Sequence, residues 1–104
     1  MKKRVLFLSV MLLLVMTPLA AVAQDEPLRI AVVMPSTKDD LAWSQALYDS
    51  LLAVQEELGG EDALEIAVSE NLWQVPDAVE AIGDYAAQGY DIVFVHGTQY
   101  GGPL

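Results

Sequence analysis

The sequence has 104 residues with 15 acidic side chains, 5 basic side chains and no cysteine. Three of the basic residues lie at positions 2–4 and every acidic residue lies beyond position 23, so residues 24–104 carry 2 basic side chains against 15 acidic ones, a formal charge of −13. A surface of this charge repels nucleic acids and anionic lipid, which excludes nucleic-acid binding. The lack of cysteine excludes a disulfide scaffold and a cysteine-ligated zinc site.

The first 23 residues have the features of a secretory signal. The basic residues at positions 2–4 precede an apolar run over 5–16, and Ala21-Val22-Ala23 fits the small-x-small rule of signal peptidase. The run is too short to cross a bilayer core of about 30 Å, so no direct membrane span is predicted. We therefore expect a signal peptide over 1–23, cleavage before Gln24, and a periplasmic or extracellular protein. The alternative is a retained N-terminal anchor. No cysteine follows the run to take a lipid anchor.

The first two elements of the mature chain are predicted to be a strand over 28–34 and a helix from about Asp40 to Leu58. Asp39 or Asp40 would cap the helix start, where negative charge is favourable. Gly59-Gly60 would end it, because glycine tolerates the left-handed conformation that follows many helices. The helix shows one apolar stripe at spacings of three and four. The stripe consists of Trp43, Leu47, Leu51, Val54 and Leu58.

The remaining elements continue the alternation. We predict a short strand over 64–69, a loop over 71–74, a helix that opens at Val75-Pro76 and closes at Gly89, and a strand over 92–95 covered on both faces. The buried face of the second helix is expected to comprise Val79, Ile82 and Ala86, with Ala78 and Tyr85 beside it. A β-α-β-α-β order predicts an α/β fold with a parallel sheet and right-handed crossovers. We therefore expect residues 24–104 to form one incomplete α/β lobe.

Polar and aromatic side chains follow each predicted strand. Because all strands of a parallel sheet end at one edge, these side chains should converge there, where open α/β sheets bind ligands. Hydroxyls, carboxylates and aromatic rings together suit a neutral polar ligand with a flat part. The alternative is that they are ordinary polar loops. The residues are Ser36, Thr37, Asp39 and Asp40 after the first strand, Asn71 and Trp73 after the second, and His96, Gly97, Thr98 and Tyr100 after the third.

Catalytic and metal-binding interpretations find little support in these loops. Asp39-Asp40 resembles the acidic pair of receiver domains, but His96-Gly97 follows the third strand, where those domains carry a phospho-accepting aspartate. A lone histidine is more often a structural group than a catalyst, and Trp43 is as readily a core residue as a stacking one. No nucleophile elbow or phosphate-binding glycine loop is present. We expect no enzyme activity, no metal and no cofactor.

Three segments resemble the start of the basic membrane protein family, the substrate-binding proteins of ABC importers related to the purine nucleoside receptor. They are residues 30–35, 40–46 and 88–97. The resemblance implies the first part of lobe 1 of a type I periplasmic binding protein, whose two lobes close on the ligand. It gives Asp40 a ligand-contacting role and Trp43 a base-stacking role. The next residue, Ser44, stands where the family commonly has asparagine, and His96 and Gly97 match a loop that approaches the ligand.

The sequence therefore predicts a solute-binding component of an ABC importer, with a permease and an ATPase as partners and a nucleoside or related compound as ligand. The expected binding residues are Ser36, Thr37, Asp40, Trp43, Ser44, His96, Gly97 and Thr98. Sugar-type binding proteins share the architecture and remain an alternative, as does an exported sensory module that signals to a membrane receptor. A secreted hydrolase would need catalytic residues from elsewhere. We expect the chain to be the front part of a longer protein.

Overall fold

The computed structural model describes residues 26–102, so the predicted signal peptide and its cleavage site lie outside the described residues. Strands and helices alternate along this part of the chain, as predicted. The largest shift in a boundary is at the first helix, which begins at Trp43 rather than near Asp40. The first strand ends at Val33, one residue before the predicted end. The elements are β1 (Leu28–Val33), α2 (Trp43–Leu58), β2 (Leu64–Ser69), α3 (Val75–Ala87), β3 (Ile92–Val95) and the single-turn 3₁₀ helix η1 (Thr98–Tyr100).

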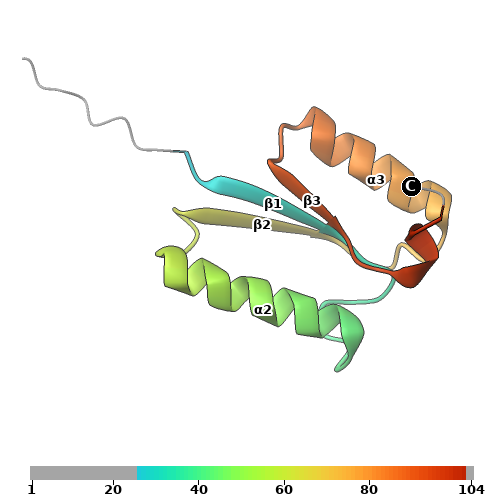
Figure 1. Ribbon diagram of the computed structural model, residues 1–104, viewed down its shortest axis with the longest axis horizontal. Coiled ribbons are helices and arrows are strands. Elements are labelled where there is room, and N and C mark those ends of the chain that lie inside the picture. The colour runs from blue at the N-terminus through green and yellow to red at the C-terminus, as the bar shows by residue number, and fades with distance from the viewer. Residues whose placement is uncertain (1–25, 103–104) are drawn as a thin grey trace, which may run out of the picture.

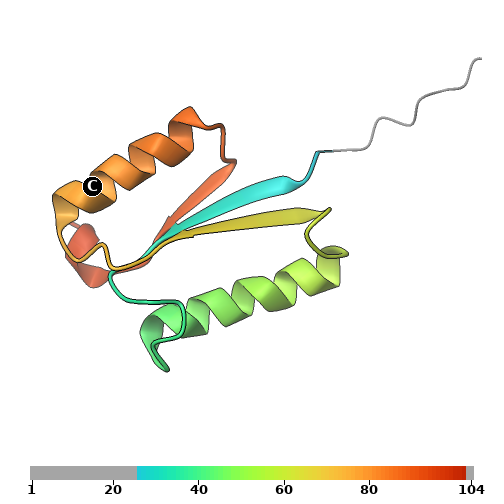
Figure 2. The same cartoon turned by 180° about the vertical axis from the view of Figure 1, so that it is seen from behind.

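The three strands form one parallel sheet in the order β2-β1-β3. In this register Ile30 of the central strand pairs with Ile66 on one side and Ile92 on the other. Figure 1 shows α2 on one face of the sheet and α3 on the opposite face, and Figure 2 shows the same three layers from behind. The α/β fold with a parallel sheet is therefore confirmed. Because all three strands are parallel, their carboxyl ends lie at one edge of the sheet.

The core on the α2 face forms around Ile30, Val32 and Met34, which contact Leu51 of α2. Leu64 of β2 completes this cluster, and Leu47 packs against it. The predicted apolar stripe of α2 is only partly buried, because Trp43, Val54 and Leu58 are 62%, 43% and 53% exposed.

The core on the α3 face contains Val33, Ala78 and Tyr100, with Ile82 and Tyr85 packed against it. The predicted buried face of α3 is correct at Ile82 and wrong at Val79 and Ala86. Ala78 is fully buried, whereas Val79 is 47% exposed and Ala86 is also exposed. Positions at spacings of four and three from Ala78 face the sheet, which is the periodicity of one helical face.

Strand β3 is covered on one face only in the part of the chain that the structure describes. Val93 and Val95 pack on the α3 side. Ile92 and Phe94 point to the other side and are 40% and 39% exposed. The prediction that this strand is covered on both faces is therefore wrong for residues 26–102. Helix α2 makes its principal sheet contacts with β2, on the far side of β1 from β3.

A polar cluster closes the amino edge of the sheet. The Arg29 side chain donates to the Glu65 carboxylate at 3.2 Å and to the Gln88 carbonyl at 2.8 Å, and its guanidinium lies 4.1 Å from the centroid of the Tyr90 ring. The Tyr90 hydroxyl donates to the other oxygen of Glu65 at 2.8 Å. Hydrogen bonds from Tyr90 and Arg29 lower the pKa of Glu65. These contacts join β1, β2 and the segment that leads from α3 into β3, at the end opposite the strand carboxyl ends.

No helix within residues 26–102 combines the length and apolar character needed to cross a membrane.

Candidate functional site

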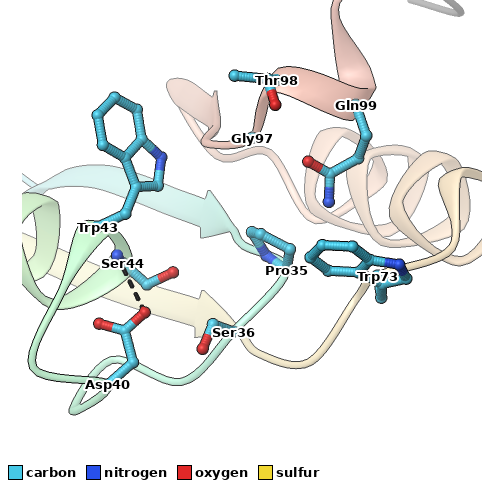
Figure 3. Close-up of a pocket in the computed structure, with 9 residues that line it drawn as sticks. All are labelled: Pro35, Ser36, Asp40, Trp43, Ser44, Trp73, Gly97, Thr98 and Gln99. Atoms are coloured by element: carbon cyan, nitrogen blue, oxygen red, sulfur yellow. Dashed lines mark hydrogen bonds between the residues drawn. The ribbon is translucent and has the colours of Figure 1, made fainter.

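A cavity of about 320 Å³ lies at the carboxyl edge of the sheet. Its walls come from the loop after β1, the first turn of α2, the loop after β2 and the segment after β3, so the convergence predicted from the sequence is present (Figure 3). Two exposed tryptophans, Trp43 and Trp73, belong to its lining. Its lining consists of Pro35, Ser36, Asp40, Trp43, Ser44, Trp73, Gly97, Thr98 and Gln99.

Asp40 organises the start of α2. Its carboxylate accepts hydrogen bonds from the backbone N–H groups of Ala42 at 2.9 Å, Ser44 at 3.3 Å and Gln45 at 3.1 Å. The bond from Gln45 is the largest cause that lowers the pKa of Asp40, followed by those from Ala42 and Ser44, with a smaller contribution from the Ser36 side chain. The carboxylate is therefore ionised at neutral pH and stabilises the positive end of the helix.

The turn that follows Asp40 is held in an unusual conformation. Leu41 adopts a left-handed backbone with φ of 56°, and its side chain is 90% exposed. Its N–H donates to the Gln45 side chain at 2.9 Å. A left-handed leucine carries a strain of about 1–2 kcal/mol. The hydrogen bonds of the Asp40 carboxylate and of the Leu41 N–H hold the backbone in this unfavourable conformation. This turn places Trp43 and Ser44 at the cavity.

Trp43 forms one wall of the cavity, and His96 contacts both its indole ring and its backbone carbonyl. The two rings are stacked, with centroids 4.7 Å apart and planes 8° from parallel. The His96 Nε2 donates to the Trp43 carbonyl at 2.9 Å, which fixes the tautomer because a carbonyl only accepts. His96 therefore lies beside the cavity and outside its lining, where it positions Trp43.

Ser44 lies on the cavity floor, where the first turn of α2 meets the sheet. The residue is 1% exposed, and its hydroxyl has no hydrogen-bond partner among the described residues. In Figure 3 this hydroxyl points toward Pro35, across the floor. Buried hydroxyls nearly always have a partner, so a free one at the bottom of a cavity offers a contact to a bound molecule.

The loop after β2 supplies the opposite aromatic wall. Trp73 is 67% exposed and lies against Pro35 at the far side of the cavity from Trp43 (Figure 3). The loop is anchored to the loop after β1 because the N–H of Asn71 donates to the Ser36 carbonyl at 3.1 Å and that of Leu72 donates to the Met34 carbonyl at 3.0 Å. Asn71 takes a left-handed conformation with φ of 60°, which asparagine tolerates better than most residues.

The segment after β3 forms the roof. Gly97 has an extended backbone, and a Cβ at this position would lie 2.7 Å from a ring carbon of Tyr100 and 2.8 Å from the Oε1 of Gln99. Tyr100 is 1% exposed and donates its hydroxyl to the Leu72 carbonyl, which joins the segment to the loop after β2. Only glycine leaves room for this close approach, so Gly97 determines where Gln99 lies.

The cavity combines apolar aromatic surface with hydrogen-bonding groups. Two indole faces and a proline provide apolar contact, while hydroxyl and amide groups on the floor and roof provide hydrogen bonds. Among residues 26–102 no three acidic or histidine side chains group together in a way that could hold a metal ion.

Most of the sequence-predicted site residues meet in this cavity. Ser36, Asp40, Trp43, Ser44, Gly97 and Thr98 line it. Thr37 and His96 lie beside it: the Thr37 carbonyl accepts from the N–H of Asp40 at 3.2 Å, and His96 supports Trp43. Sequence reasoning missed Pro35 and Gln99. The signal for Gln99 was its place two residues after Gly97 in a loop already expected at the site.

Comparison of the chain with protein-family models, curated proteins and solved structures gave no match.

Proposed function

We propose that this protein is the solute-binding component of an ABC importer and captures a nucleoside or related small polar ligand outside the cytoplasmic membrane. The observation that carries the proposal is the cavity at the carboxyl edge of the sheet, framed by Trp43 and Trp73 and floored by polar groups. Exposed indole faces of this size bind flat rings by stacking, and hydrogen-bonding groups between them fix the orientation of the ring.

The size and charge of the cavity fit such a ligand. A volume of about 320 Å³ is at the lower end of the range for small-molecule sites. Asp40 already uses its carboxylate to accept three backbone hydrogen bonds of α2, so its charge is matched by the helix rather than available to a metal or a cationic substrate. The site therefore suits a neutral ligand with a ring and hydroxyls.

The family resemblance supplies the rest of the proposal. In this view the three-stranded sheet is the first part of lobe 1 of a type I periplasmic binding protein, and a second lobe closes over the two exposed tryptophans. A permease and an ATPase would then receive the ligand. The protein would bind its ligand without transforming it. Ser44, in place of the family's common asparagine, would alter the contacts to the base.

A thermal-shift experiment tests this proposal. The product of the complete reading frame should gain stability with inosine or uridine, because a ligand at 100 times its Kd stabilises the native state by about 2.7 kcal/mol. Trp43→Ala should remove most of that gain. Phe94→Ala, which removes a partly exposed aromatic ring outside the cavity lining, should leave the ligand-induced gain unchanged.

The same thermal-shift experiment, carried out with sugars, tests the alternative that the protein is a sugar-type binding protein. Stabilisation by ribose or glucose but not by nucleosides would replace the nucleoside assignment with a sugar-binding one. Stabilisation by neither class would contradict ligand capture at this site. Genes for a permease and an ATPase beside the gene would support import, whereas a histidine kinase or chemoreceptor gene there would support sensing.

A further inference from the structure

His96 links the start of α2 to the end of the sheet. Its backbone N–H donates to the carbonyl of Val33, the last residue of β1, at 2.8 Å. Its side chain reaches α2, where the ring stacks on the indole of Trp43 and the Nε2 donates to the Trp43 carbonyl at 2.9 Å. Because Val33 is fully buried in the central strand, the ring that contacts Trp43 is attached to the core of the molecule.

The indole of Trp43 depends on this contact for its orientation. Trp43 is 62% exposed and belongs to neither of the two core clusters that residues 26–102 form. Side chains as exposed as this one change rotamer within picoseconds to nanoseconds when nothing holds them. The stack with His96, with ring centroids 4.7 Å apart and planes 8° from parallel, has the geometry of a favourable aromatic pair. It therefore restricts the indole to one orientation.

The contact with His96 leaves part of the indole free for a ligand. Trp43 lines the cavity and His96 does not, so the part of the indole that faces the cavity is one that the imidazole leaves uncovered. Figure 3 shows the Trp43 indole at one side of the cavity and Trp73 at the other. A flat ring that enters the cavity can therefore stack on Trp43 while the imidazole stays in place.

We infer that His96 is a positioning residue for ligand capture: it orients the Trp43 indole for stacking and does not itself contact the ligand. This inference rests on the proposed function and assigns a role within the same site. A side chain that becomes ordered only when a ligand binds lowers the affinity, because its lost rotamer freedom opposes binding. Since the stack with His96 orders Trp43 in the free protein, the ligand binds without this loss.

Substitutions at position 96 test the inference in the product of the complete reading frame. In titration calorimetry with inosine and uridine, His96→Ala should weaken binding about 3- to 10-fold, the effect of one side chain that must become ordered on binding. His96→Phe keeps a ring that can stack on the indole but has no polar atom, so it should restore most of the wild-type affinity. The matched control is Phe94→Ala, which removes an aromatic ring two residues earlier and outside the cavity lining. It should bind both nucleosides as the wild type does.

Near-ultraviolet circular dichroism of the free protein tests the orientation of Trp43 without a ligand, because an indole held in one orientation gives strong bands and a mobile one does not. The contribution of Trp43 is the difference between the spectra of the wild type and Trp43→Phe. We expect this contribution in the wild type and in His96→Phe, and its loss in His96→Ala.

Three results would overturn the inference while leaving nucleoside binding intact. They are a wild type without the Trp43 contribution, wild-type affinity in His96→Ala, and a His96→Phe variant that binds as weakly as His96→Ala. Failure of both nucleosides to bind the wild type would instead overturn the proposed function, and with it the role of His96 in capture. The dichroism would then still show whether His96 orients Trp43.

Discussion

Gly97 shows how a single missing side chain shapes the cavity. The residue follows β3, and its extended backbone is one that any amino acid adopts, so conformational freedom is not why glycine is needed. The requirement is space, because the ring of Tyr100 and the amide of Gln99 both approach where a Cβ would lie. Since Tyr100 is almost fully buried, its ring has no room to move aside.

Gly97→Ala should therefore destabilise the protein by about 1–3 kcal/mol, the usual cost of overpacking a core. Urea denaturation followed by circular dichroism measures the change. The matched control is Gly83→Ala within α3, where an added methyl meets nothing within 4 Å. That substitution should stabilise the protein by about 0.5–1 kcal/mol, because alanine is the better helix former. A Gly97→Ala variant as stable as Gly83→Ala would show that the roof of the cavity is loosely packed.

At the scale of single residues, the sequence was a good guide to which side chains reach the cavity and a poor guide to what they do there. Parallel topology alone brings Ser36, Trp43 and Thr98 to one edge. The stacking of His96 on Trp43 depends on how the start of α2 sits against the end of β3, which no local pattern encodes. The close packing of Gln99 and Tyr100 on Gly97 is local in sequence, but no residue pattern in this loop indicates it.

Helix α2 illustrates the same point at the scale of elements. Its end at Gly59 was predictable, because glycine tolerates the left-handed conformation. Asp40 accepts N–H groups of the first turn as predicted, but it lies two residues before the N-cap residue, Ala42. The start of the helix was not predictable, because the left-handed turn at Leu41 delays the first helical residue to Trp43.

On α3 the sequence placed Ile82 correctly on the buried face but favoured Val79, which is more apolar, over Ala78, which packs against the sheet. Helical periodicity predicts that a helix has a buried face more reliably than it predicts which residues lie at the centre of that face.

The Asp40 cap gives α2 a defined response to acid. Its folded-state pKa is lowered below the ordinary value of 3.8, so the stability that it contributes is present above that value and is lost as the pH falls through the lower folded-state pKa. In urea denaturation at a series of pH values, Asp40→Asn should be less stable than the wild type at neutral pH and lose less on acidification. Asp39→Asn, which removes the neighbouring exposed carboxylate, should follow the wild-type curve. Parallel acid profiles for Asp40→Asn and the wild type would contradict this role.

Over the whole molecule, the two ends of the sheet differ in a way that fits a binding lobe. The amino edge is closed by the Arg29, Glu65 and Tyr90 cluster, which satisfies its own polar groups. The carboxyl edge is open and holds exposed indoles and unpaired buried polar atoms. Fold class and the location of this edge followed from the alternation of elements. The partial exposure of β3 did not, because an apolar sequence does not reveal which neighbours cover it.

A binding site on one lobe that stays open to solvent binds its ligand more weakly than a site enclosed by two lobes. Trp43 and Trp73 are 62% and 67% exposed, so a ligand stacked on either indole would keep much of its own surface in water. In the proposed two-lobed protein, closure supplies the remaining burial. Residues 24–104 alone should therefore bind nucleosides more weakly than micromolar.

Titration calorimetry of the complete reading-frame product with inosine, uridine, ribose and glucose tests the central claim most directly. We predict saturable binding of at least one of the two nucleosides at micromolar affinity or tighter, and no comparable binding of the two sugars. Titration of residues 24–104 under the same conditions should show the weaker binding expected of one wall. Absence of heat with both nucleosides and both sugars would contradict the account of the carboxyl-edge cavity as a ligand-capture site.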